Sequence, residues 1–230
     1  MNRFWEIVIR PLLYMTNSAN IVEIGAESGK NTIKLLEYCK RKKGVLHVID
    51  PAPQFNVGLY KNKYGNTFQM HRDFSLNVLP KLKDYDAVLI DGDHNWFTVY
   101  NELKVIERNV GARGEFPMVL LHDTAWPYGR RDLYYFPKGI PPKFRKPYAK
   151  KGMQQGRSEL LEQGGFNPHL HNALYENGEK NGVLTAIEDF LRETYYRLSF
   201  FKSMQHHGLG ILMPGDLSGM LAVQLSKLPL

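Results

Sequence analysis

The 230-residue chain is long enough for one α/β domain with a buried core, and its 43% hydrophobic and 23% charged residues are usual for a soluble globular protein. It has no apolar run of about 18 residues or more, which excludes a membrane-spanning segment. The net charge of +7 favours an anionic partner, either nucleic acid or a phosphorylated or acidic small molecule.

The first apolar stretch, Phe4–Tyr14, has the hydrophobicity of a signal sequence, but Glu6, Arg10 and Pro11 interrupt it and no small-residue cleavage site follows. We therefore predict an amphipathic helix at the start of the chain. The single cysteine, Cys39, cannot form a disulfide within the chain and belongs to a helical pattern, which favours a buried structural thiol. Together these features predict a cytoplasmic protein.

Short apolar runs alternate with helical patterns over the first half of the chain, which is typical of a parallel sheet covered by helices. The expected strands are Ala19–Ile24, Val45–Ile49, Thr67–His71, Ala87–Ile90 and Pro117–Leu121. The expected helices are Gly29–Arg41, Leu76–Pro80 and Phe97–Asn109. Right-handed crossovers place the carboxyl ends of these strands at one edge of the sheet, where ligands bind.

A long segment, residues 124–182, is rich in Pro, Gly, Tyr and Asn and has little strand or helix pattern. Because such long loops in compact domains are usually functional, we expect an insertion that covers a substrate. The basic stretch Arg130–Lys151 lies in it and is a candidate for ligand contact, whereas Lys40–Lys43 fits a solvated helix end. After the insertion we expect a helix, two strands and an apolar tail, at Val183–Tyr195, Arg197–Met204, Gly208–Met213 and Pro214–Leu230.

These elements predict a single domain over residues 1–230. Its fold class is α/β, doubly wound, with a mostly parallel seven-stranded sheet and the inserted segment after the fifth strand.

The first strand runs into a glycine turn and then a helix. The turn has the spacing G-x-x-x-G, at Gly25 and Gly29, which is neither a dinucleotide-binding motif nor a phosphate-binding loop. A cationic sulfonium ligand needs no pyrophosphate cradle, and Glu23 at the end of the strand suits its charge. The alternative is a plain turn between strand and helix.

Acidic residues also follow the second and third strands. Asp50 lies where a ribose diol would donate hydrogen bonds, and Asp73 could contact an adenine amino group. The alternatives are that Asp50 turns the chain and that Asp73 or Ser75 caps the following helix. The motif V-E-I-G-x-x-x-G, an acidic residue after strand two and an Asp-Ser pair after strand three resemble the class I methyltransferase fold over residues 19–123. This resemblance implies S-adenosylmethionine as donor, bound by Glu23, Gly25, Ser28, Asp50 and Asp73.

The fourth and fifth strands end in Asp91-Gly92-Asp93-His94 and His122-Asp123-Thr124. Neighbouring strands lie about 4.8 Å apart, so Asp91, Asp123 and His122 could bind one divalent cation. Oxygen ligands favour Mg²⁺ or Mn²⁺, while a histidine ligand shifts the preference toward transition metals. The alternatives are a helix cap at Asp91 and a core histidine at His122.

The arrangement resembles the metal-dependent O-methyltransferases that act on catechols and macrolide sugars. In this family an aspartate after strand four and an acidic pair after strand five hold Mg²⁺. Asp123 matches the second member of the pair, whereas His122 and Thr124 depart from the usual flanking ligands. The family's general base lies three residues after the strand-four aspartate, which is His94 here, expected on the first turn of the next helix. A surface histidine is the alternative.

We therefore predict a metal-dependent O-methyltransferase for a small hydroxylated molecule, such as a sugar or oligosaccharide. The rivals are a metal-dependent phosphoesterase, a nucleic-acid methyltransferase and a non-enzymatic nucleotide-binding module. The chain lacks an N-P-P-Y motif and a separate nucleic-acid-binding domain, so we expect neither a nucleic-acid nor a membrane partner. A homo-oligomer is compatible with the sequence.

Overall fold

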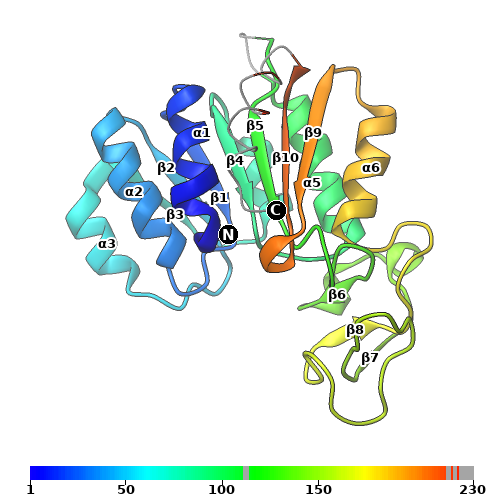
Figure 1. Cartoon of the computed structure of the whole chain (residues 1–230). Helices are drawn as coiled ribbons and strands as arrows, with labels where there is room; N and C mark the ends of the chain where they lie inside the picture. Colours follow the sequence, from blue (N-terminus) through cyan, green and yellow to red (C-terminus); the bar gives the residue numbers. More distant parts are fainter. Residues whose placement is uncertain (111–113, 216–218, 220–221, 223–230) are drawn as a thin grey trace.

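The computed structural model describes residues 1–110, 114–215, 219 and 222, and its centre is a seven-stranded sheet (Figure 1). In chain order the strands are β1 (Ile21–Ile24), β2 (Leu46–Ile49), β3 (Phe68–His71), β4 (Ala87–Ile90), β5 (Met118–His122), β9 (Leu198–Ser203) and β10 (Leu209–Pro214). Their order in the sheet is β3-β2-β1-β4-β5-β10-β9. Strands β1 to β5 are parallel, whereas β10 runs antiparallel to both β5 and β9. The predicted doubly wound, mostly parallel sheet is confirmed.

Helices and turns of several kinds connect these strands. The α-helices are α1 (Arg10–Met15), α2 (Lys30–Lys42), α3 (Val57–Tyr64), α4 (Ser75–Val78), α5 (Trp96–Arg108) and α6 (Val183–Glu193). Short 3-10 helices are η1 (Asn2–Phe4), η3 (Gly65–Thr67), η4 (Leu79–Lys81), η5 (Pro137–Gly139), η6 (Pro142–Phe144) and η7 (Gln205–His207), and η2 (Trp5–Ile9) is a π-helix.

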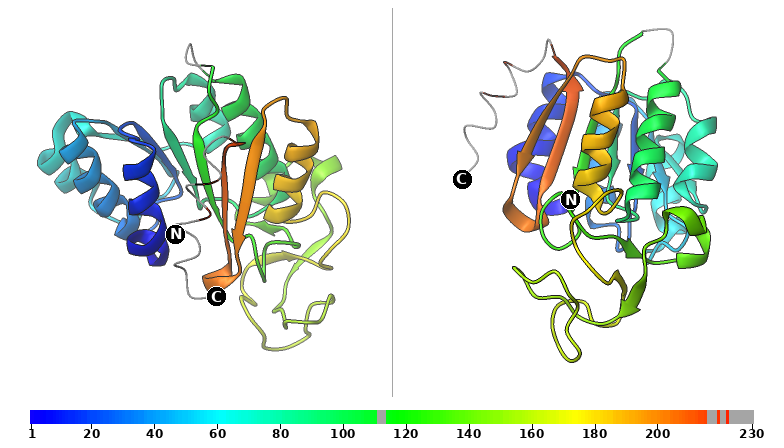
Figure 2. Two further views of the ribbon diagram at one scale, coloured as in Figure 1. Left: turned by 45° about the horizontal axis from the view of Figure 1, so that its top comes forward. Right: turned by 90° about the vertical axis from the view of Figure 1, so that its right-hand side faces the viewer.

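The sheet is the middle of three layers (Figure 2). Alternate side chains of β1 point to opposite faces: Ile21 packs with the N-terminal helices and α2, whereas Val22 packs with α5 and α6. All four residues of β1 are buried, as are those of β4. Strands buried on both faces read as continuous apolar runs, which is why these two were recognisable in the sequence.

Three details differ from the sequence-based expectations. The opening helix is not continuous, because η1 and η2 precede α1, which begins at Arg10 beside Pro11. Proline has no N–H group to donate to the preceding helical turn. Helix α3 was not predicted, because only its last residue, Tyr64, is buried and it therefore has no apolar stripe. The strands also begin one or two residues later than expected, at Ile21, Leu46 and Phe68.

The insertion forms a small antiparallel sheet that projects beyond the carboxyl edge of the main sheet (Figure 1). Its strands are β6 (Leu133–Tyr134), β7 (Tyr148–Lys150) and β8 (His171–Ala173), in the order β6-β8-β7. Strands this short carry little periodicity, so the sequence indicated only an irregular segment. The fully buried guanidinium of Arg131 donates hydrogen bonds to the carbonyls of Ala173 and Ser158 and so ties the segment together.

Within the described ranges, no helix combines the length and apolarity needed to cross a membrane. The apolar tail expected from Pro214 onward lies outside the described residues, except for Pro214, Gly215, Gly219 and Ala222.

Candidate active site

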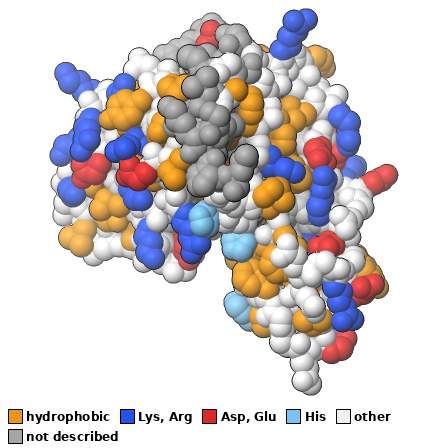
Figure 3. Space-filling view, in the orientation of Figure 1, with side chains coloured by type: hydrophobic (Ala, Val, Ile, Leu, Met, Phe, Trp, Pro, Cys, Tyr) orange, Lys and Arg blue, Asp and Glu red, His pale blue; other side chains and the backbone are white. Residues whose placement is uncertain are grey.

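A cavity of about 930 Å³ lies at the carboxyl ends of the parallel strands. Its wall includes the turn after β1 (residues 25–28), the residues after β2 (50–52), those after β3 (74–77) and those after β4 (91–94). From the insertion, Tyr135, Phe136 and Ile140 also line it. In the orientation of Figure 1, the surface is hollowed between the main body and the insertion, and histidine side chains gather at the edge of the hollow (Figure 3).

The glycine turn is held by Asp50. One carboxylate oxygen of Asp50 accepts hydrogen bonds from the backbone N–H groups of Ala26 (2.8 Å) and Glu27 (2.9 Å), and the other accepts one from Ala52 (2.8 Å). Gly25 has a φ of 84°, a conformation that other residues rarely adopt. Asp50 and Ser28 both line the cavity, and their contact with the donor stays a prediction.

Glu23 lies beneath the turn, outside the lining of the cavity. It is 2% exposed and accepts a hydrogen bond of 2.7 Å from the side-chain amide of Asn31. Burial raises the pKa of Glu23 to about 7. Its other oxygen, Oε2, has no hydrogen-bond partner among the described residues. The structure therefore gives Glu23 a place next to the donor turn but no direct access to the cavity.

Asp73 also lies outside the cavity lining. Its carboxylate accepts hydrogen bonds from the backbone N–H of Phe74 (2.7 Å) and the side chain of Asn77 (2.9 Å). The four residues that follow Asp73 line the cavity instead. A contact between Asp73 and adenine thus stays a prediction, and its observed role is to shape the start of α4.

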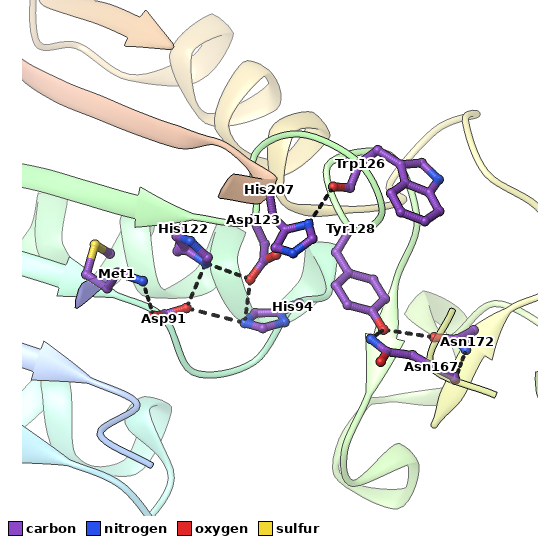
Figure 4. Close-up of polar contacts among 10 residues, drawn as sticks. All are labelled: Met1, Asp91, His94, His122, Asp123, Trp126, Tyr128, Asn167, Asn172 and His207. Carbon is purple, nitrogen blue, oxygen red and sulfur yellow. Dashed lines mark hydrogen bonds and ion pairs between the residues drawn. The ribbon is translucent and has the colours of Figure 1, made fainter. Parts of the chain in front are cut away.

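Asp91, His122 and Asp123 converge at the ends of β4 and β5, with ligand atoms within 4.8 Å of one another (Figure 4). Nδ1 of His122 lies 2.9 Å from Oδ2 of Asp123 and 3.2 Å from Oδ1 of Asp91. The amino group of Met1 lies 2.9 Å from the other oxygen of Asp91. Asp123 has a left-handed backbone conformation, with a φ of 58°, which is uncommon for a residue other than glycine and often marks functional sites.

The charges in this cluster stabilise one another. Burial disfavours the ionised form of Asp91, but the hydrogen bond from His122 and the neighbouring imidazole of His94 outweigh it and lower the pKa of Asp91. Burial likewise lowers the pKa of His122, yet hydrogen bonds to Asp123 and Asp91 outweigh it and raise this pKa to about 9. His94 and His122 likewise lower the pKa of Asp123 against the effect of burial, so positive charge beside the two carboxylates stabilises their ionised forms.

His94 lies beside this cluster, with Nε2 at 3.3 Å from Oδ2 of Asp123 and 3.8 Å from Oδ1 of Asp91. It precedes helix α5, so its expected place on the first helical turn is wrong. The reason is Asn95, whose side chain accepts a hydrogen bond from the N–H of Thr98 and caps the helix one residue after His94. Burial lowers the pKa of His94, but the charges of Asp123 and Asp91 outweigh it and raise this pKa.

The sequence reasoning missed Asp93 as a site residue. Its side chain lines the cavity, and one oxygen accepts a hydrogen bond of 2.9 Å from the hydroxyl of Thr98. The other oxygen is buried and has no hydrogen-bond partner among the described residues. The run Asp91-Gly92-Asp93-His94, with acidic residues on both sides of a glycine after a strand, is the sequence feature from which Asp93 could have been predicted.

Comparisons with known proteins find a matching domain and solved structures with the same fold. Residues 22–124 match the family model described as a methyltransferase domain. A search of curated proteins finds none that matches the chain. Three solved structures share the fold. A putative caffeoyl-CoA O-methyltransferase from Staphylococcus aureus is 14% identical, with a TM-score of 0.52 over 90% of this chain and 81% of the other.

The second structure is an SAH-bound methyltransferase from Podospora anserina, which is 15% identical, with a TM-score of 0.50 over 89% of this chain and 75% of the other. The third is an O-methyltransferase from Streptomyces achromogenes, involved in tomaymycin synthesis and solved with SAM; it is 12% identical, with a TM-score of 0.50 over 89% and 76%. Residues 22–124 of this chain thus match a methyltransferase domain, and the chain shares the fold of solved class I, S-adenosylmethionine-dependent methyltransferases.

Proposed function

We propose that this protein transfers a methyl group from S-adenosylmethionine to a hydroxyl group of a small molecule, and that the reaction depends on a divalent cation. The observation that carries the proposal is the convergence of Asp91, His122 and Asp123 beside the donor cavity, with His94 next to them. The S. aureus and S. achromogenes proteins, described as O-methyltransferases, support the choice of oxygen as the atom that receives the methyl group.

The residues present fit a cation. Two ionised carboxylates and one imidazole lie close enough to share one ion, and they are the ligand types that bind Mg²⁺, Mn²⁺ and transition metals. Asp91, His122 and Asp123 would hold the ion. A divalent cation at this place would lower the pKa of a hydroxyl group beside it.

His94 would then act as the general base. Its Nε2 would take up the proton of the acceptor hydroxyl, and the resulting imidazolium would be stabilised by Asp91 and Asp123, which lie 3.8 and 3.3 Å away. The acceptor oxygen forms a bond to the methyl carbon while the bond from that carbon to sulfur breaks. The turn at Gly25–Ser28 and the Asp50 that holds it would fix the donor for this in-line transfer.

We further propose that residues 124–182 cover the acceptor and that the acceptor is a sugar or a similar polyol. Tyr135 and Phe136 support this proposal, because they are 56% and 51% exposed beside the cavity. Exposed aromatic faces can pack against the C–H face of a sugar ring, while its hydroxyl groups reach the polar cluster. A planar aromatic acceptor is the competing choice.

The test is transfer of labelled methyl groups to a panel of sugars, nucleotide sugars and catechols, with and without a chelator. We expect labelling of a sugar acceptor that stops on chelation and returns when Mg²⁺ or Mn²⁺ is added. Asp123→Asn should lose this turnover, whereas the exposed Asp84→Asn should keep it. Turnover that survives exhaustive chelation would contradict the metal-dependent reaction.

A further inference from the structure

The His94 ring lies against two tyrosines of the insertion. Neither ring nitrogen makes a hydrogen bond of good geometry within the described residues, and the contacts of Nε2 with Asp123 and Asp91, at 3.3 and 3.8 Å, involve one edge of the ring only. The ring packs against Tyr128, with centroids 5.6 Å apart, and against Tyr135, at 5.8 Å. Because Tyr135 is largely exposed and Tyr128 is only 4% exposed, Tyr128 is the rigid side of this contact.

Tyr128 is itself fixed by two asparagines (Figure 4). Its hydroxyl donates a hydrogen bond of 3.3 Å to Oδ1 of Asn172 and accepts one of 2.8 Å from Nδ2 of Asn167. Asn172 is fully buried, and its Nδ2 donates to the carbonyls of Lys151 and Asn167, both at 2.9 Å. The ring that faces His94 is therefore anchored by hydrogen bonds from distant parts of the insertion.

The backbone on both sides of His94 is bound to the same segment. The carbonyl of His94 accepts a hydrogen bond of 3.0 Å from the N–H of Leu133. Two residues later, the N–H of Trp96 donates to the buried carboxylate of Asp132 at 2.7 Å. The same oxygen of Asp132 accepts a hydrogen bond from the N–H of Gly182, where the insertion returns to the main fold.

We propose that Tyr128 is a positioning residue for His94, which makes the folded insertion a condition for a correctly oriented base. The inference rests on the proposed function, in which His94 takes the acceptor's proton. Its consequence is that changes in the acceptor cover alter the chemical step and not only acceptor binding. Small errors in the placement of a reacting group are costly, and a displacement of about 1 Å can lower the rate by roughly 100-fold.

The test compares Tyr128→Leu, Tyr128→Phe and a control, Tyr175→Leu, which makes the same change at a 60% exposed tyrosine of the insertion. Circular dichroism checks that each variant folds, and calorimetry measures its affinity for S-adenosylmethionine. Tyr128→Leu should lower kcat by roughly 10- to 100-fold while donor affinity stays unchanged. Tyr128→Phe keeps the ring and should lose much less, and Tyr175→Leu should behave as the wild type.

A second readout is independent of activity. The ring protons of His94, assigned by comparison with His94→Gln, should shift in the NMR spectrum of Tyr128→Leu and shift less in Tyr128→Phe. An unchanged kcat together with unchanged His94 signals in Tyr128→Leu would overturn the inference. If His94→Gln keeps full activity, the proposed base is wrong, but the NMR comparison still shows whether Tyr128 orients the ring.

Discussion

Gly25 lies so close to Asp91 that a Cβ atom at Gly25 would be 2.2 Å from the Asp91 carbonyl oxygen. Gly25 begins the turn that lines the donor cavity, and Asp91 belongs to the candidate metal site. In the proposed function, contact between these two turns would bring the methyl donor next to the hydroxyl that is to be methylated. No side chain larger than hydrogen fits between them.

Gly25→Ala should therefore weaken donor binding and destabilise the fold. A left-handed conformation alone costs a residue with a side chain of order 1–3 kcal/mol, and the clash with Asp91 adds to it. Gly65→Ala is the matched control, because Gly65 also has a positive φ but a Cβ there would meet nothing within 4 Å. Urea unfolding and calorimetry of both variants measure the difference. Equal losses at Gly25 and Gly65 would show that the close approach does not matter.

Asp50→Ala should weaken donor binding by about 1–3 kcal/mol, the range for leaving buried hydrogen-bonding groups without a partner. Besides losing the predicted ribose contact, the variant leaves three backbone N–H groups, those of Ala26, Glu27 and Ala52, without their acceptor. The turn should loosen as well, which lowers the free energy of unfolding. Identical donor affinities of the variant and the wild type in calorimetry would disprove the assignment.

His94→Ala should lower kcat by roughly 10²–10⁴ and leave donor affinity intact, as expected for the loss of a positioned base. It should also flatten the acidic limb of the pH–rate profile, because the group that must be deprotonated is gone. Single-turnover kinetics with saturating donor measures the effect on the chemical step. A near-normal kcat with an unchanged profile would move the search for the base to His122, His169 or His171.

Glu102 should make the free energy of unfolding fall as pH rises, whereas a carboxylate paired with a positive charge makes it rise. It is fully buried in α5, and burial, reinforced by the charge of Asp93, raises its pKa to about 8. Between its ordinary value near 4.5 and about 8, the unfolded chain releases this proton and the folded protein keeps it. The free energy of unfolding should therefore fall as pH rises, by up to about 1.4 kcal/mol per pH unit from this group.

Urea unfolding between pH 5 and pH 8 tests this prediction, with Glu102→Gln as the variant and the exposed Glu159→Gln as the control. Glutamine stays neutral at every pH, so Glu102→Gln should flatten the slope, while Glu159→Gln should keep it. Glu23, whose pKa is raised to about 7, contributes a further slope of the same sign up to that pH. Parallel curves for the wild type and Glu102→Gln would contradict the prediction.

The sheet was predictable because each strand can be recognised from the few residues that form it and follow it. The apolar runs of β1 and β4 and the polar residues after them follow from burial on both faces. Helix α3 could not be predicted in this way, because it stands on the surface with little buried side chain. The insertion was recognised only as irregular, since its fold depends on long-range contacts such as those of the buried Arg131.

The site was predictable to the extent that strand ends determine it. Asp91, His122 and Asp123 meet because parallel strands place them at one edge. The sequence could not show which carboxylate oxygens already accept hydrogen bonds within the protein. The carboxylate of Asp50 holds the turn, Glu23 is buried beneath it, and Asp93, which was not singled out, has a buried oxygen without a hydrogen-bond partner among the described residues. Such details depend on side-chain contacts rather than on spacing.

The insertion is joined at its base, where the N–H groups of Val183 and Leu184 donate hydrogen bonds of 2.9 Å to the carbonyls of Tyr128 and Gly129. Because its two ends already meet there, lengthening or reshaping the part beyond them adds little entropy cost, since closure entropy grows only slowly with loop length. The outer part of the insertion can therefore change in length while the turn at Gly25–Ser28 and Asp50 stay as they are. A graft of another segment at this base would have to keep Tyr128 together with Asn167 and Asn172, which fix the Tyr128 ring.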